Sequence, residues 1–112
     1  MPDDTFNLPN ISAFEALRKS FDRTLTLVDL RKPDAVAKSG KRIAGALVRD
    51  PFAFDHQDPL TRATGQIAIF CVHGHEVSQF GCALMRVHGV DAVYIKGGFE
   101  AMSLAGANLE TI

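Results

Sequence analysis

The feature that most constrains this chain is a short, unbroken apolar run at residues 67–71 that ends on a cysteine. Runs of this kind are typical of strands that are buried on both faces of a parallel sheet. A polar loop with Gly74 follows, and then a helix is predicted from about 78 to 88, closed by Gly89. The chain is therefore expected to place the thiol of Cys71 at the carboxyl end of a buried strand, facing the start of a helix.

The rest of the sequence alternates between strand and helix patterns. Strands are predicted over 24–30, 43–48 and 90–95, and helices over 13–19, 33–39 and 99–104. Ser12 followed by Glu15 forms a capping box at the start of the first helix. Residues 50–64 are expected to form a loop with a helical turn after Asp58. This alternation predicts an α/β protein with a mainly parallel central sheet that is flanked by helices on both faces.

Length and charge narrow the classes of protein that fit. The 112 residues match one ordinary domain, so we expect a single domain over 1–112, with 1–10 as an N-terminal arm or edge strand. The net charge is −1 and the basic residues are scattered, which argues against a nucleic-acid partner. The acidic N-terminus does not resemble a signal peptide, and no apolar run approaches the ~20 residues of a membrane span. We therefore expect a cytoplasmic protein with no membrane partner.

The two cysteines are interpreted separately, because their spacing is not that of a CxxC motif. Cys82 falls on the same predicted helix face as Leu84 and Met85, which favours a buried core thiol over a resolving cysteine. The loop after Cys71 can turn its N–H groups toward the sulfur, and the positive end of the following helix points there too. Both features favour a thiolate nucleophile at Cys71. The alternative is a small buried hydrophobe at a strand end.

Four stretches of the sequence carry a resemblance to a known family. They are LVDLRKP at 27–33, IAGAL at 43–47, IFCVHG at 69–74 and YIKGGF at 94–99. In this order and spacing, from about residue 11 to 110, the chain resembles a rhodanese (sulfurtransferase) domain. The resemblance implies a rhodanese-like fold with no cofactor and no metal. It also implies that Cys71 is the catalytic residue.

The resemblance further implies a specific reaction. Cys71 would take a sulfane sulfur from a small-molecule donor such as thiosulfate, become a persulfide, and pass the sulfur to a thiol, cyanide or a protein acceptor. Asp29 and Arg31 match the family pattern, and we interpret them as mainly structural. The backbone N–H groups of the loop and of the residue that opens the helix would bind the persulfide. These substrate-binding residues are Val72, His73, Gly74, His75, Glu76, Val77 and Ser78.

The loop departs from the family pattern in one respect. Ser78 comes one position later than the serine of typical family loops, so the loop from Cys71 to Val77 is predicted to be one residue longer. Such a loop resembles that of dual-specificity phosphatases and arsenate reductases, which bind tetrahedral oxyanions. Val77, however, stands where those enzymes carry an arginine, and Glu76 would repel an oxyanion if it pointed inward. A sulfurtransferase is therefore favoured, with a phosphatase or arsenate-reductase-like enzyme and a non-catalytic rhodanese-like binding or sensor module as alternatives.

Several side chains near the loop have more than one interpretation. His73 and His75 could project into solvent, assist an anionic substrate, or bind a metal ion together with the thiolate. Phenylalanines that could either line the pocket or belong to the core are Phe52, Phe54 and Phe99. Two further histidines, His56 and His88, are predicted to lie on the surface.

Overall fold

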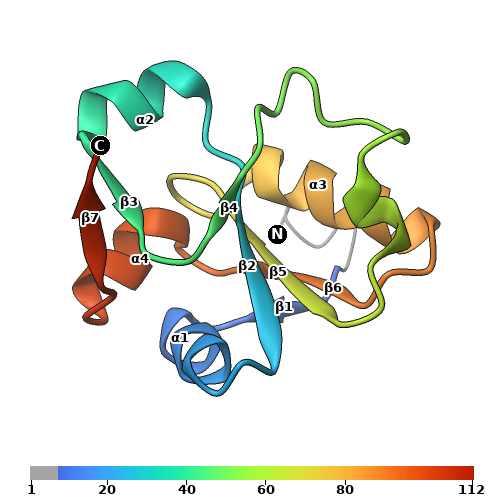
Figure 1. The fold of residues 1–112 in the computed structure, drawn as a ribbon, viewed down its shortest axis with the longest axis horizontal. Helices are drawn as coiled ribbons and strands as arrows, with labels where there is room; N and C mark the ends of the chain where they lie inside the picture. Colours follow the sequence, from blue (N-terminus) through green and yellow to red (C-terminus); the bar gives the residue numbers. More distant parts are fainter. Residues whose placement is uncertain (1–7) are drawn as a thin grey trace.

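The computed structural model describes residues 8–112, and its centre is a five-stranded parallel sheet (Figure 1). The strands follow the order β1-β6-β5-β2-β4, and every neighbouring pair is parallel. Their bounds are β1 Asn10–Ile11, β2 Leu25–Asp29, β4 Leu47–Val48, β5 Gln66–Phe70 and β6 Ala92–Ile95. A separate antiparallel pair joins β3 (Lys41–Ile43) to β7 (Leu109–Thr111). The predicted α/β class with a mainly parallel sheet is confirmed.

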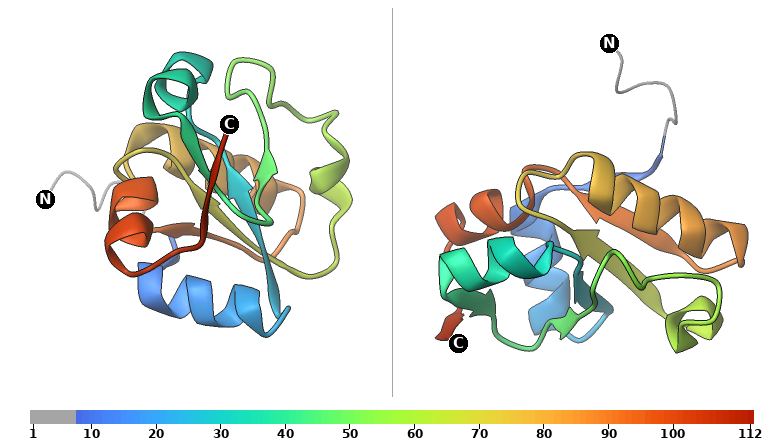
Figure 2. Two further views of the ribbon diagram at one scale, coloured as in Figure 1. Left: turned by 60° about the vertical axis from the view of Figure 1, so that its left-hand side comes forward. Right: turned by 90° about the horizontal axis from the view of Figure 1, so that it is seen from above.

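Helices cover both faces of the sheet, with α1 and α4 on one face and α3 on the other (Figure 2). The helices are α1 Ala13–Phe21, α2 Pro33–Ser39, α3 Glu76–Val87 and α4 Gly98–Leu104, with a 3₁₀ turn η2 at Pro59–Arg62. Ser12 caps α1, since its hydroxyl accepts a hydrogen bond from the Glu15 N–H at 3.1 Å. None of the helices in residues 8–112 is long and apolar enough to cross a membrane. The cytoplasmic location stays a prediction.

The central strand β5 has both faces buried, as its apolar run predicts. Ile67 and Ile69 belong to the cluster that packs under α3, whereas Ala68 and Phe70 belong to the cluster under α1 and α4. All four side chains are at most 1% exposed. Since successive side chains of a strand point to opposite faces, a strand between two helical layers needs an apolar residue at every position. This burial holds the carboxyl end of β5 in place, and Cys71 follows directly after it.

The prediction of one strand over 43–48 is wrong. The segment divides at Gly45, which adopts a left-handed φ of +84°, and the Ala46 N–H closes the turn onto the Ile43 carbonyl at 3.2 Å. Residues before the turn pair with β7, a strand that the sequence analysis did not predict, whereas those after it pair with β2. The apolar pattern runs through the turn, but the backbone freedom of glycine lets the chain change sheets there.

The start of the described chain confirms an edge strand. Asn10 and Ile11 pair with Tyr94 and Ile95 of β6, and β1 lies at the outer edge of the sheet. The part of the predicted arm at 1–7 lies outside the described residues. The predicted helical turn after Asp58 is confirmed as η2, which Asp58 caps through its side chain.

Candidate active site

Cys71 follows the last residue of β5 and is 8% exposed. The strand end is held by the neighbouring chain, because the Leu30 N–H donates to the Phe70 carbonyl at 2.8 Å. Cys71 lines a cavity of about 220 Å³ at this carboxyl edge of the sheet, where ligands of open α/β sheets bind. The other lining residues are Arg31, Lys32, Ala35, Val72, His73, His75, Glu76 and Val77.

The helix after the loop begins earlier than predicted. α3 starts at Glu76 rather than near Ser78, with His75 as its N-cap residue, and the Gln79 N–H closes the first turn onto the His75 carbonyl at 3.0 Å. An acidic residue such as Glu76 is favoured in this first turn because the helix end carries partial positive charge. The loop proper is therefore 71–75, and the predicted loop residues Glu76 and Val77 belong to the helix.

The backbone around Cys71 presents a row of free donors. Within residues 8–112, no protein oxygen accepts a hydrogen bond from any of the seven consecutive N–H groups from Val72 to Ser78. The last three of these donors, from Glu76 onward, belong to the first turn of α3, where an α-helix leaves its N–H groups without internal partners. A run of unpaired N–H groups beside a helix start can bind an anion.

The carbonyl groups of the same loop are bonded to α4. The Phe99 N–H donates to the Cys71 carbonyl at 2.7 Å, and the Glu100 N–H donates to the Val72 carbonyl at 3.2 Å. These two bonds tie the beginning of the loop to the first turn of α4. The carbonyl groups of Cys71 and Val72 are thereby fixed by α4, while the N–H groups from Val72 onward remain free to bind a ligand.

Two glycines make this close approach possible. A β-carbon on Gly98 would lie 2.2 Å from the Cys71 carbonyl oxygen, and one on Gly74 would lie 2.7 Å from both the Gly97 nitrogen and the Ile95 oxygen. Both glycines also have left-handed φ values, +57° and +78°. The glycine pair 97–98 falls between the strand predicted over 90–95 and the helix predicted over 99–104, and the structure packs it against the loop.

Ser78 contributes a side chain as well as a backbone donor. Its hydroxyl oxygen lies 3.3 Å from the Cys71 sulfur and 3.2 Å from the His75 carbonyl, and the residue is fully buried. The thiol can donate to the Ser78 oxygen while the hydroxyl donates to His75. After loss of the thiol proton, the hydroxyl can rotate and donate to the sulfur instead. The sequence pattern predicted only the N–H group of Ser78 as a donor, and this side-chain contact arises from the fold.

Asp29 and Arg31 form a buried ion pair beside the cavity. The Arg31 guanidinium contacts both carboxylate oxygens, with an Nη2 to Oδ2 distance of 2.8 Å, and it also donates to the Lys41 carbonyl at 3.0 Å. Its central carbon lies 4.0 Å from the centre of the Phe99 ring. The side chains of the pair are 1% and 0% exposed. These internal partners support the structural interpretation of both residues.

The loop histidines are exposed on the rim of the cavity. His73 Nδ1 lies 3.9 Å from Glu100 Oε1, and the rings of His73 and His75 are 6.5 Å apart between centres. The described part of the chain contains no group of three or more His, Cys, Asp or Glu side chains that could hold a metal ion. The geometry therefore brings the two histidines to the cavity entrance and does not assemble a metal site around Cys71.

Cys82 lies in the core beneath α3, as predicted. It is fully buried, its thiol lies 3.4 Å from the Ala92 carbonyl oxygen, and burial raises its pKa from 9.0 to about 11. A thiol of this kind is protonated and shielded, which excludes the properties of a resolving cysteine.

The three phenylalanines that could line the pocket or belong to the core lie in three different environments. Phe54 is buried in the core under α3, and Phe99 packs on Arg31. Phe52 is 77% exposed, so it belongs neither to the core nor to the wall of the cavity. His56 and His88 are exposed, as predicted, and their Nδ1 and Nε2 atoms lie 2.8 Å apart.

Solved structures with a similar fold include a rhodanese-related protein from Thermoplasma volcanium, with a TM-score of 0.77 and 18% identity over 91% of this chain and 97% of the other. A thiosulfate sulfurtransferase from Pseudomonas aeruginosa gives a TM-score of 0.76 and 16% identity over 93% of this chain and 19% of the other. A possible tyrosine phosphatase from Rhodopseudomonas palustris gives 0.75 and 22% identity over 97% and 89%. These likenesses show a rhodanese-like fold. No family model matches the chain, and no curated protein matches it by sequence.

Proposed function

We propose that this chain, which has a rhodanese-like fold, is a sulfurtransferase that works through a persulfide on Cys71. The Cys71 thiolate attacks the outer sulfur of a donor such as thiosulfate, a new S–S bond forms, and the donor's own S–S bond breaks to release sulfite with the bonding pair. A thiolate or cyanide acceptor then attacks the outer sulfur of the persulfide. Cys71 leaves as a thiolate, so no external oxidant or reductant is consumed.

The observation that supports this proposal best is the row of unpaired N–H groups from Val72 to Ser78. A persulfide carries one diffuse negative charge, which several backbone dipoles can stabilise without a charged side chain. Lys32, exposed at the cavity rim, adds a positive charge that attracts an anionic donor toward Cys71.

A phosphatase is the second candidate, because the spacing from Cys71 to Ser78 and the Rhodopseudomonas neighbour both point to it. The charges of the cavity argue against it. The phosphatase arginine position is occupied by Val77, Arg31 is engaged by Asp29, and Glu76 lines the cavity. A dianionic phosphate needs fixed positive charge at its oxygens in the transition state. Val77, Arg31 and Glu76 do not supply it, and the Lys32 side chain lies exposed at the cavity rim.

The test of the sulfurtransferase proposal is the intact mass of the protein after treatment with thiosulfate. We expect a gain of one sulfur atom in the wild type, loss of the gain in Cys71→Ser, and an unchanged gain in the matched variant Cys82→Ser. An unmodified wild-type mass with both thiosulfate and mercaptopyruvate would contradict the proposal, as would an adduct that persists in Cys71→Ser.

Aryl phosphate hydrolysis separates the second candidate. We expect no hydrolysis by the wild type at high enzyme concentration, and we expect Val77→Arg to gain phosphate affinity because it introduces the missing guanidinium. Wild-type turnover that Cys71→Ser abolishes would favour the phosphatase instead. If the protein forms no sulfur adduct and hydrolyses no phosphate, the non-catalytic binding or sensor module becomes the favoured function.

A further inference from the structure

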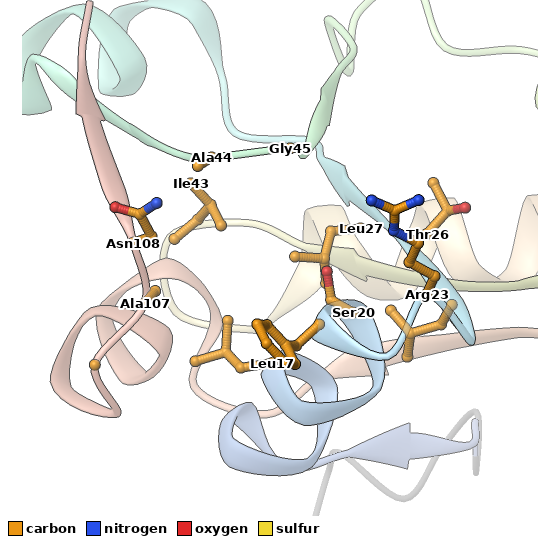
Figure 3. Close-up of a pocket in the computed structure, with 13 residues that line it drawn as sticks. Leu17, Ser20, Arg23, Thr26, Leu27, Ile43, Ala44, Gly45, Ala107 and Asn108 are labelled. Carbon is orange, nitrogen blue, oxygen red and sulfur yellow. The ribbon is translucent and has the colours of Figure 1, made fainter.

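A larger cavity lies away from Cys71, at the other end of β2. It has a volume of about 660 Å³ and is formed by α1, β2, the turn between β3 and β4, and the segment before β7 (Figure 3). It shares no lining residue with the Cys71 cavity. A volume of this size falls within the range of ligand-binding clefts. We call this cavity the β2 groove.

The β2 groove runs along a strand edge that has no partner. β5 pairs with all five residues of β2, but β4 pairs only with Val28 and Asp29. Within residues 8–112, Leu25, Thr26 and Leu27 therefore have no strand beside them on the β4 side, and all three line the groove. The opening exists because the residues before Gly45 belong to β3, which pairs with β7 and not with β2. Leu25 and Leu27 are 7% and 2% exposed, whereas Thr26 is exposed, so the accessible part of this edge is centred on Thr26. An unpaired strand edge of this kind is a template for an added strand.

Apolar side chains form part of the wall beside this edge, and Ser20, Thr26 and Asn108 add polar groups to it. Leu17 and Phe21 of α1 line the groove together with Ile43 and Ala107, and Phe21 is 87% exposed. Leu25 and Leu27 pack in the cluster on the α1 side of the sheet. Since side chains alternate along a strand, an added strand would turn every second side chain toward this wall. The groove thus favours an extended segment with apolar residues at alternate positions.

One charge marks the groove. Arg23 is the sole charged residue among those that line it, and no carboxylate pairs with its guanidinium within the described part of the chain. Figure 3 shows Arg23 and Asn108 at opposite ends of the cavity. Arg23 is also the one non-glycine residue in 8–112 with a positive φ, +62°, a conformation that side chains other than glycine rarely adopt. The free cation selects a partner that carries a carboxylate.

We propose that the β2 groove binds an extended segment of a partner protein as an added strand on the open edge of β2. The segment carries apolar side chains at alternate positions, which pack on Leu17 and Phe21, and a carboxylate that pairs with Arg23. Recognition of this kind takes its affinity from main-chain hydrogen bonds and its specificity from the side-chain pockets. Because the two cavities share no residue, a docked partner leaves Cys71 open.

The probe is the acetylated peptide amide Val-Thr-Val-Glu-Val, added to the ¹⁵N-labelled full chain. We expect its largest amide shifts at Leu25, Thr26 and Leu27, and none at Val72 to Ser78. Replacing the peptide Glu by Gln, or changing Arg23→Gln, should weaken binding by up to about fivefold, as for an exposed ion pair. The matched variant Arg62→Gln, which changes an exposed arginine outside the groove, should bind like the wild type.

A second peptide keeps the test independent of any protein variant. N-methylation of its central residues removes main-chain donors and should weaken binding to the wild type by about tenfold. Equal binding of the methylated peptide, shifts confined to another face, or no shifts at millimolar peptide would overturn the proposal. Concentration-dependent shifts of the same amides without peptide would also overturn it, since they would place a second copy of this chain in the groove.

Discussion

At the scale of single residues, the contact between Cys71 and Ser78 determines how the sulfur can carry charge. The Ser78 hydroxyl has two alternative hydrogen-bond partners, the Cys71 sulfur at 3.3 Å and the His75 carbonyl at 3.2 Å. Rotation of one buried hydroxyl can therefore follow the loss and return of the thiol proton. In the proposed reaction this adds a side-chain donor to the unpaired backbone N–H groups of the loop.

Ser78→Ala removes this donor and should slow persulfide formation by about tenfold or more, the loss expected for a hydrogen bond to a charged group. The measurement is the rate of thiosulfate-dependent mass gain at a fixed pH. Ser103→Ala on α4, outside the Cys71 cavity, is the matched control. A Ser78→Ala rate within twofold of the wild type would show that the hydroxyl only fills space.

At the scale of helices and strands, the site depends on how α4 meets the Cys71 loop. The first N–H groups after Gly98 donate to the carbonyls of Cys71 and Val72, and Gly98 leaves room for that approach. The glycine pair is thus a structural requirement of the loop, although α3 and β6 separate the pair from Cys71 in the sequence.

Gly98→Ala should therefore disturb the loop. Its β-carbon would lie 2.2 Å from the Cys71 carbonyl oxygen, so α4 must shift away from the loop. We expect a loss of stability of about 1–3 kcal/mol and at least a tenfold slower mass gain with thiosulfate. Gly65→Ala is the matched control, because no atom lies within 4 Å of the added carbon. Faster hydrogen exchange at the Phe99 and Glu100 amides would report the loosened contact directly, and unchanged exchange would contradict it.

Local patterns predicted those parts of the fold that depend on local interactions. The apolar run of β5, the Ser12 cap and the closing Gly89 each act within a few residues, so the sequence was sufficient to place them. The division of the predicted strand over 43–48 depends on pairing with β7, which no local pattern encodes. The same holds for the site. Cys71 was predicted from its strand end, whereas the α4 contacts arise only from the packed fold.

At the scale of the whole molecule, Cys82 links stability to pH. In the folded state its pKa is raised from 9.0 to about 11 by burial, so the unfolded chain loses this proton first as the pH rises. The contribution of Cys82 is fully present below about pH 9 and is lost progressively up to about pH 11, at about 1.4 kcal/mol per pH unit.

Urea unfolding between about pH 8 and about pH 11 checks this prediction. The free energy of unfolding should fall more steeply with pH in the wild type than in Cys82→Ala, which lacks the thiol. Because other groups also titrate in this range, the difference between the two slopes is the measured quantity. Parallel curves for the two proteins would contradict a raised pKa at Cys82.

The antiparallel pair of β3 and β7 has a consequence for how the chain acquires its structure. Lys41 bonds to Thr111, 70 residues further along, so β3 has no strand partner until that late segment has left the ribosome. Contacts over such separations close large loops and slow folding. Arg31, whose guanidinium donates to the Lys41 carbonyl, is bonded to this same late pair. The wall of the Cys71 cavity is therefore expected to become ordered only after β7 has been synthesised.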